Sequence, residues 1–182
     1  PGLIKVALHG SKSKSEQVYK NKALLLAISF GHTDCTALLL KHKADINYVS
    51  DEGCLPLLVA IMHRKHEILK LLLKHSCKID VCDSEGNNAL HWAVKLNDQE
   101  ALQLLLPYCK DLDFQNSKLE TPLIVAAESG YEVLLRMLLQ GGCDLYKTKF
   151  SRRTALHRAV EKGNIGCVSV LLEAGVDVEH KD

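Results

Sequence analysis

A period of 33 residues constrains this chain more than any other feature of its sequence. Alanine recurs at this spacing five times, and a leucine stands three positions before each alanine. Repeats of this length are typical of solenoids, in which each unit buries its apolar face only against its neighbours. The period therefore predicts about five stacked units. The two columns are Ala27, Ala60, Ala93, Ala126 and Ala159, and Leu24, Leu57, Leu90, Leu123 and Leu156.

Each unit is predicted to contain two short helices. Thr121 and Pro122 suit the start of the first helix, because threonine caps free N–H groups and proline fits the first helical position. Arg64 departs from the residues expected at the end of that helix, where a left-handed conformation is wanted. Paired leucines mark the second helix. Helices this short are marginal in water alone, so stacking is obligatory. The expected first-helix ends are Gly31, Asn97, Gly130 and Gly163.

Two segments of the units resemble the ankyrin repeat. The stretches 88–91, 121–124 and 154–157 are similar to its Thr-Pro-Leu-His signature, and 142–144 and 175–177 to its Gly-Ala-Asp segment. The resemblance implies an all-α ankyrin-repeat solenoid of about five 33-residue helix-turn-helix units with short β-hairpin fingers. Fingers and first helices would then form a concave face. His91 and His157 would join the fingers to the helix starts by hydrogen bonds.

The repeat domain is expected to span residues 16–182. Before it, an N-terminal segment, 1–15, is expected to contain a helix at Leu3–Leu8 and a polar loop at Ser11–Ser15. This segment is either a degenerate helix or the remnant of a preceding repeat. Asp182 stands where a sixth finger would begin, which favours a piece of a longer array, although Arg158 in an otherwise apolar column suits a terminal unit. The expected units are roughly 16–48, 49–81, 82–114, 115–147 and 148–182.

Composition restricts function without identifying it. The formal net charge of +1 gives no general attraction to nucleic acid or membranes. No apolar run reaches the ~18 residues that span a bilayer. The seven cysteines are an odd number and lie within or beside apolar helical patterns, where cysteine behaves as a small hydrophobe. We therefore expect free thiols, in a protein of the cytoplasm and/or nucleus. Small-residue or helix-core columns hold Cys35, Cys77, Cys143 and Cys167.

No pattern for catalysis or metal binding stands out. Cys77 and Cys82 have no second pair at zinc-ribbon spacing, and His63 and His66 form a short polar corner at a helix–helix turn. Phosphate-binding loops, nucleophile elbows and paired catalytic carboxylates are missing from the sequence. We expect no catalytic residues, no metal and no cofactor.

Columns that packing leaves free are the candidates for partner contacts. Phe30, Met62 and Leu96 present apolar side chains at the ends of the first helices, with His63 beside Met62. An apolar line of this kind is typical of a binding surface, or else these side chains fold onto neighbouring helices. Charge changes along the chain, from an acidic middle to a basic fifth unit. The basic residues are Lys149, Arg152, Arg153 and Arg158.

Aromatic residues offer further candidates. Trp92 shares a column with Leu26 and Val59, which favours a core position over a contact position. Tyr48 and Phe114, with Val81 between them in the same column, would either pack finger on finger or form an apolar rail for a partner. Asn47, in Asp45-Ile46-Asn47, resembles the asparagine hydroxylation context of ankyrin repeats and is a candidate modification site.

The leading functional hypothesis is a non-catalytic scaffold that binds a peptide or protein on the concave face, with an acidic partner segment meeting the fifth unit. One alternative is nucleic-acid or nucleotide binding through that basic unit, which only Phe150 accompanies as a stacking platform. Another is a structural spacer within a larger enzyme or channel. No membrane partner is expected.

Overall fold

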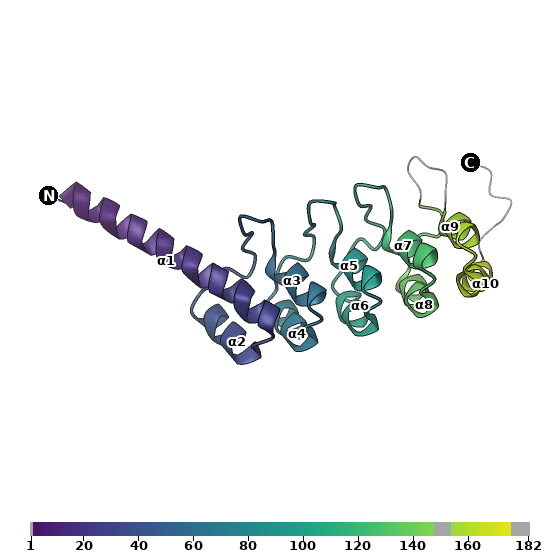
Figure 1. Ribbon diagram of the computed structural model, residues 1–182, viewed down its shortest axis with the longest axis horizontal. Helices are drawn as coiled ribbons and strands as arrows, with labels where there is room; N and C mark the ends of the chain where they lie inside the picture. Colours follow the sequence, from purple (N-terminus) through teal and green to yellow (C-terminus); the bar gives the residue numbers. More distant parts are fainter. Residues whose placement is uncertain (1, 148–153, 176–182) are drawn as a thin grey trace. The chain divides into compact units, whose positions relative to one another are not determined.

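The computed structural model describes residues 2–147 and 154–175, with side chains from residue 15 onward (Figure 1). In these ranges the backbone forms ten helices. The chain forms two compact units, Pro1–Lys78 and Ile79–Asp182, called here the N-terminal and C-terminal units. The helices are α1 (Gly2–Phe30), α2 (Thr33–Lys41), α3 (Pro56–Met62), α4 (His66–Lys74), α5 (Ala89–Lys95), α6 (Gln99–Leu105), α7 (Pro122–Ser129), α8 (Glu132–Gly141), α9 (Ala155–Glu161) and α10 (Ile165–Glu173).

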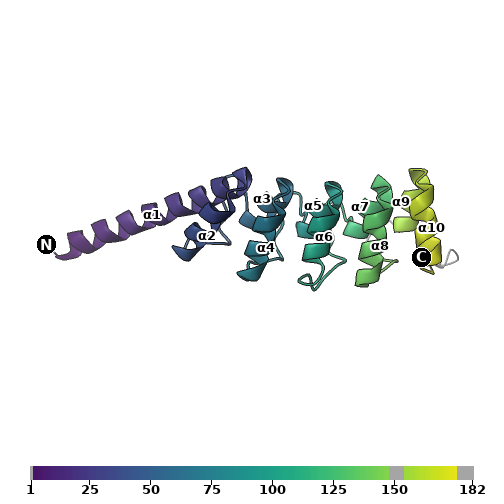
Figure 2. The ribbon, with the colours of Figure 1, turned by 90° about the horizontal axis from the view of Figure 1, so that it is seen from below.

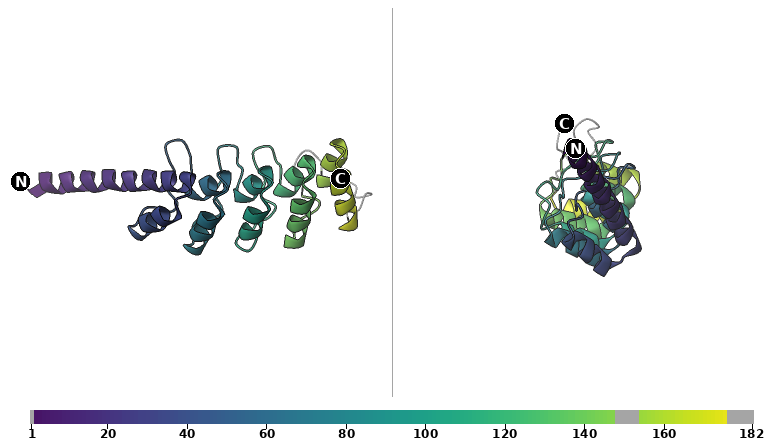
Figure 3. Two further views of the ribbon diagram at one scale, coloured as in Figure 1. Left: turned by 60° about the horizontal axis from the view of Figure 1, so that its bottom comes forward. Right: turned by 90° about the vertical axis from the view of Figure 1, so that its left-hand side faces the viewer.

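The N-terminal unit contains the first two helix pairs. Helix α1 packs against α2 and α3, and α4 packs against α3 and α2. The first part of α1 projects beyond α2 (Figure 3). This helix runs without a break through Ser11–Ser15, so the predicted polar loop is wrong. Lysine is a good helix former, serine is only mildly unfavourable, and this stretch contains neither proline nor glycine.

The C-terminal unit contains the remaining three pairs, α5/α6, α7/α8 and α9/α10 (Figure 2). The first helices lie side by side, α5 against α7 and α7 against α9. The second helices form a parallel row, α6 against α8 and α8 against α10. This two-row arrangement within the unit is the helix-pair stacking that the 33-residue period predicts, and the all-α repeat fold is confirmed.

The periodic columns form the core of both units. Leu72 and Leu105, in the second-helix column, are completely buried, as are Ala60 and Ala93 of the alanine column. Cys35 is exposed, so its predicted core position is wrong. Its column packs against the second helix of the preceding repeat, and no second helix precedes α2 in the described part of the chain.

Fingers connect one helix pair to the next, and three finger tips are described at residues 50–54, 83–87 and 116–120. Each tip closes with one antiparallel backbone hydrogen bond of 3.0 Å, from Ser50 to Cys54, from Asp83 to Asn87 and from Asn116 to Glu120. The only β-bridge in the described residues joins Cys82 and Asn88. The fingers are therefore tight hairpins rather than strands.

Helix ends follow more than one local solution. Arg64 follows the C-cap of α3 in the left-handed region at φ 53°, and Gly130 is the left-handed C-cap of α7 at φ 75°. The start of α3 has Leu55 as its N-cap with no side-chain hydrogen bond, whereas Asn88 caps α5. No helix in the described part of the chain is both long enough and apolar enough to cross a bilayer.

Candidate binding site

The three finger tips share one turn. The side chain of the first tip residue, Ser50, Asp83 or Asn116, accepts hydrogen bonds from the backbone N–H groups two and four residues later. These bonds measure 2.8 to 3.3 Å. Short polar side chains commonly stabilise turns in this way. The tips are therefore held in shape by their own residues.

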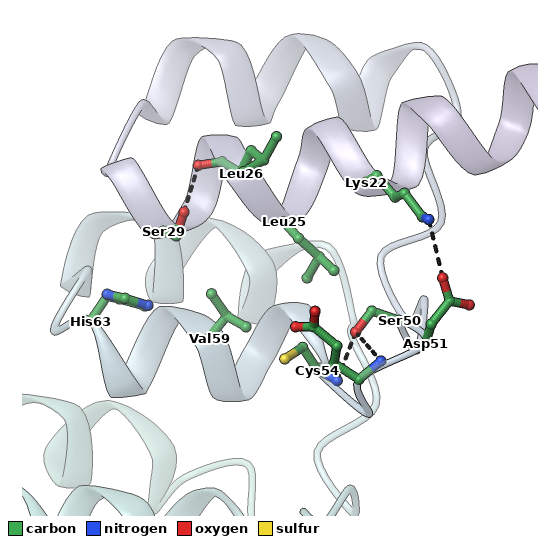
Figure 4. Close-up of a pocket in the computed structure, with 10 residues that line it drawn as sticks. Lys22, Leu25, Leu26, Ser29, Ser50, Asp51, Cys54, Val59 and His63 are labelled. Carbon is green, nitrogen blue, oxygen red and sulfur yellow. Dashed lines mark hydrogen bonds and ion pairs between the residues drawn. The ribbon is translucent and has the colours of Figure 1, made fainter.

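In the N-terminal unit a groove of about 400 Å³ lies between the end of α1, the 50–54 tip and α3 (Figure 4). Leu25 of α1 and Val59 of α3 point into the space between the two helices, with the Cys54 thiol beside them. These three side chains give the groove an apolar floor. The full lining is Lys22, Leu25, Leu26, Ser29, Ser50, Asp51, Glu52, Cys54, Val59 and His63.

Charged groups stand at the edges of this groove. At one end the Lys22 Nζ donates to Asp51 Oδ2 over 3.1 Å, and this hydrogen bond raises the pKa of the lysine. Glu52 is exposed, and no ion pair to its carboxylate forms within the described part of the chain. His63 lies at the opposite end. Apart from His63, the lining carries two carboxylates and one ammonium group, so the edge at the finger is acidic.

Exposed apolar side chains continue from the groove along its helices. Phe30 and Leu26 are four residues apart on one face of α1 and are 70% and 59% exposed. Met62, the last residue of α3, is 45% exposed. The predicted apolar residues of this unit, Phe30 and Met62, are thus accessible to a partner, and the predicted His63 lines the groove itself.

Two other predicted residues of the N-terminal unit have structural partners. The Asn47 side-chain oxygen accepts the backbone N–H of Lys78 over 2.8 Å, and its own N–H donates to Asp45 Oδ1 over 2.9 Å. The side chain is partly buried, and its amide oxygen ties one finger base to the next. Tyr48 is partly buried as well. Both lie away from the groove lining.

In the C-terminal unit His91 replaces an apolar residue and closes the corresponding space. Its ring is completely buried, and Nε2–H donates to the carbonyl oxygen of Glu120 over 2.8 Å. The Asn88 side chain accepts the backbone N–H of His91, completing a capping box at the start of α5. Phe114 meets the imidazole edge-on, with ring centroids 6.5 Å apart. The expected role of His91 in joining finger and helix is thus seen directly.

Trp92 is half-buried and fixed by polar contacts. Its Nε1–H donates to Asp83 Oδ2 over 2.9 Å, and Lys95 Nζ lies 5.5 Å from the centroid of its ring. Burial acts to raise the pKa of Asp83, but hydrogen bonds from Asn87, from the Glu85 N–H and from Trp92 hold it below the usual value. The indole is therefore neither a fully buried core residue nor a free contact residue. Leu96, at the end of the same helix, is partly buried.

The basic end of the chain is only partly described. Arg158 pairs with Glu161 at 3.5 Å, and Lys162 pairs with Glu128 at 3.1 Å. These ion pairs neutralise positive charge on α9. The other predicted basic contacts, Lys149, Arg152 and Arg153, lie outside the described residues.

The sequence prediction missed the groove floor. Leu25 and Cys54 occupy the columns of His91 and Glu120, the hydrogen-bonded pair of the C-terminal unit. A leucine in the histidine column lacks the donor that bonds the finger carbonyl, but this alone does not indicate a groove, because Leu58 in the same column is buried. The 33-residue period does not reveal that the space beside Leu25 and Cys54 is open.

All seven cysteines are free thiols in the structure. Burial raises the pKa of Cys77 to about 11 and of Cys109 and Cys143 to about 12. In the described residues, no three histidine, cysteine or carboxylate side chains gather closely enough to hold a metal ion.

Comparison with protein families agrees with this geometry. The family model described as ankyrin repeats (3 copies) matches in four overlapping segments, residues 2–83, 24–115, 65–149 and 90–182. Together these segments cover nearly the whole chain. No curated protein matches the chain significantly.

Proposed function

Because the chain belongs to the ankyrin-repeat family, whose members are generally protein–protein interaction modules, we propose that it binds a peptide or protein partner through its fingers and first helices. In this proposal the chain is a non-catalytic scaffold, consistent with a typically non-catalytic family. The seven free thiols support placing it in the cytoplasm or nucleus.

The observation that carries the proposal is the groove of the N-terminal unit and the apolar side chains that border it. Contiguous apolar patches larger than a few hundred Å² are rare on monomeric proteins and mark binding sites. Leu26, Phe30 and Met62 are all at least 45% exposed, and they come from the two helices that form the groove walls. Such residues are candidates for the few contacts that supply most of the binding energy.

A capture experiment tests this function. We would immobilise the wild-type chain, the double variant Phe30→Ala/Met62→Ala, and Leu38→Ala as control, and quantify the proteins retained from a cell lysate by mass spectrometry. Leu38 is a matched control because it is 56% exposed on α2, away from the groove lining. We expect the double variant to lose at least about fivefold of the specific partners, since central contact residues cost more than about 1 kcal/mol each.

Retention that is equal in all three samples would contradict a binding role for these side chains. A nuclease-treated arm separates the alternative class of function. If capture disappears with nuclease and is unaffected by the double variant, the basic fifth repeat binds nucleic acid and the protein-binding proposal is wrong.

The basic fifth repeat belongs to the same proposal as an electrostatic contact for an acidic partner segment. Reversing Arg152 and Arg153 to glutamate is expected mainly to slow association, because rim charges act on encounter. The defect should shrink as salt rises above ~0.15 M, where the Debye length is ~8 Å. Association rates measured at two salt concentrations check this; a defect confined to dissociation would contradict it.

A further inference from the structure

The groove of the N-terminal unit lies at two columns of the repeat that a hydrogen bond bridges in the C-terminal unit. In the C-terminal unit His91 spans the space between α5 and the 116–120 tip and donates to the Glu120 carbonyl. In the N-terminal unit the same columns hold Leu25 and Cys54, and neither side chain bridges helix and finger. The 50–54 tip is instead tied to α1 by the Lys22–Asp51 ion pair at the edge of the groove.

Resting on the proposed function, we propose that this groove binds one large apolar side chain of an extended peptide, with a lysine or arginine of the peptide next to Glu52. The apolar side chain would lie on Leu25 and Val59. The basic side chain would lie at the acidic edge formed by the finger tip.

The groove is small and its floor is apolar. Ligand pockets range from about 300 to 1,000 Å³, and a volume of about 400 Å³ is near the lower limit. The floor consists of an isobutyl group, an isopropyl group and a thiol, from Leu25, Val59 and Cys54. None of these groups offers a strong hydrogen-bond partner, so the occupant of the floor is apolar.

The charge at the rim determines which flanking residue the peptide carries. The Asp51 carboxylate already pairs with Lys22 over 3.1 Å, whereas no ion pair to Glu52 forms in the described residues. A peptide guanidinium or ammonium group at Glu52 would form a charge-assisted hydrogen bond. A peptide carboxylate there would be repelled. The groove therefore selects a basic neighbour and disfavours an acidic one.

The walls of the groove are in place before binding. Ser50 and Cys54 pair through their backbones over 3.0 Å, and the Ser50 hydroxyl accepts the N–H of Cys54 over 3.0 Å. The opposite walls are the helices α1 and α3, which pack against each other. A site that needs no ordering on binding loses less affinity to conformational entropy.

The first experiment defines the motif with a random 12-residue peptide library displayed on phage and selected against the wild-type chain. Enriched peptides should share a Leu, Ile, Met or Phe within two residues of Lys or Arg. Synthetic peptides of the enriched sequence, with and without Lys/Arg→Glu, then give dissociation constants. We expect the Glu-containing peptide to bind at least about tenfold more weakly.

A charge swap tests the rim. In Glu52→Lys the preference should move toward the Glu-containing peptide and the basic peptide should weaken about tenfold. Asp34→Lys makes the same charge change on the exposed surface of α2 and should leave both affinities within about twofold. Equal loss in the two variants would show a general field effect and overturn the assignment of Glu52.

Alkylation of the native thiols shows whether a peptide covers the floor of the groove. Cys54 lines the groove, and Cys35 is exposed on α2 outside it, so the two serve as probe and internal control. A saturating concentration of the selected peptide should slow alkylation of Cys54 by N-ethylmaleimide at least about fivefold while Cys35 reacts at an unchanged rate. If the peptide protects neither thiol, or if it protects both, it binds outside the groove.

The outcomes distinguish this inference from the proposed function. Peptides that bind without protecting Cys54, or without any dependence on Glu52, overturn the groove assignment and leave a protein-binding function intact. A library that yields no apolar-basic motif also overturns it. Loss of the proposed function itself is judged separately, by the lysate capture with Phe30→Ala/Met62→Ala.

Discussion

The two units treat the space between a first helix and the following finger in opposite ways. In the C-terminal unit His91 fills it and donates Nε2–H to the Glu120 carbonyl over 2.8 Å. In the N-terminal unit Leu25 and Cys54 hold the same columns and line an open groove. A carbonyl oxygen has two lone pairs, and the finger uses one of them in each case to close its own turn. The His91 donor thus closes this space in one unit, whereas Leu25 offers no donor to the Cys54 carbonyl in the other.

The finger tips differ in a related way. In the C-terminal unit the 83–87 and 116–120 tips bind one another, through the N–H of Ser117 to the Glu85 carbonyl over 2.9 Å and through Asn116 to Asn87 over 3.1 Å. In the N-terminal unit the 50–54 tip is tied to α1 by the exposed Lys22–Asp51 pair. Exposed ion pairs contribute little, typically about 0.2–1 kcal/mol. The 50–54 tip is therefore tied to α1 less firmly than the 83–87 and 116–120 tips are tied to one another.

The largest expected effect tests whether this difference is confined to the finger surface. Leu72 and Leu105 occupy the same column, one in each unit, and both are completely buried. Replacing either by alanine should lower the free energy of unfolding by about 2–5 kcal/mol, through lost burial and a residual cavity. Urea denaturation followed by circular dichroism measures both. A much smaller cost for Leu72→Ala would show that the cores differ as well.

The next effect separates backbone conformation from finger packing. Gly53 and Gly86 have the same left-handed φ of 76°, but a Cβ at Gly53 would meet no atom within 4 Å, whereas at Gly86 it would lie 2.9 Å from the Ser117 nitrogen. Alanine at Gly53 should cost about 1–2 kcal/mol, the conformational penalty alone. Alanine at Gly86 should cost about 1–3 kcal/mol more, because the neighbouring finger must shift. Equal costs, measured by urea denaturation, would contradict the closer finger packing of the C-terminal unit.

The third test exchanges the residues at positions 25 and 91, which share one column of the repeat. His91→Leu leaves the Glu120 carbonyl without its second partner and should cost about 1–3 kcal/mol of stability. Leu25→His places an imidazole opposite Cys54, where it should occupy part of the groove and slow alkylation of that thiol. Denaturation and timed alkylation check the two variants. If His91→Leu is neutral and Leu25→His leaves Cys54 as reactive as before, the column does not control the groove.

Lowering the pH should weaken the contribution of His91 to the free energy of unfolding. Burial, the largest cause, holds the pKa of its ring below the usual value of about 6.5. As pH falls below that value, the unfolded chain takes up a proton that the folded chain excludes, so the stability from His91 is full above pH ~6.5 and declines below it. The advantage of wild type over His91→Leu in urea should therefore shrink between pH 7.5 and 5.5. An advantage that grows would mean a protonated ring donating to Asn88 Oδ1, which lies 2.7 Å from Nδ1.

The smallest effects concern thiol reactivity. Cys54 and Cys35 should react first with N-ethylmaleimide, because both are accessible, while the Cys109 and Cys143 thiols stay protonated and shielded at pH 8 with pKa values of about 12. Mass spectrometry of the native protein over time gives the order, and all seven thiols should react once the chain is unfolded. Cys143 reacting as fast as Cys35 would show that the C-terminal unit opens readily.

Most of the fold could be predicted from the sequence because the same buried positions recur in every repeat. The buried columns of Leu72 and Leu105, the capping of α7 by Thr121 and the finger contact of His91 all agree with expectation. The errors fall where the period stops applying. Ser11–Ser15 precedes the first full repeat, where composition alone was used, and Cys35 lies in a core column whose covering helix does not exist in the described residues.

The candidate site was less predictable. Phe30 and Met62 were found from the columns that packing leaves free, and both are exposed. Trp92 was expected to favour the core, but its Nε1–H bond to Asp83 holds it half-buried at the surface. Such a bond depends on the distance between a finger and a helix, which the spacing of residues along the chain does not specify.

The sequence by itself determined the repeat, the core columns and the absence of polar groups at Leu25 and Cys54. These are properties of single positions, since each follows from which side chains avoid water or offer a donor. Only the tertiary structure decided that Leu25, Val59 and Cys54 converge on a groove edged by Glu52. A helix, the next helix and the finger between them must be placed in space before an empty volume among them exists. Hydrophobic burial determines which side chains form the core. The shape of a groove depends on backbone geometry and on hydrogen bonds between elements.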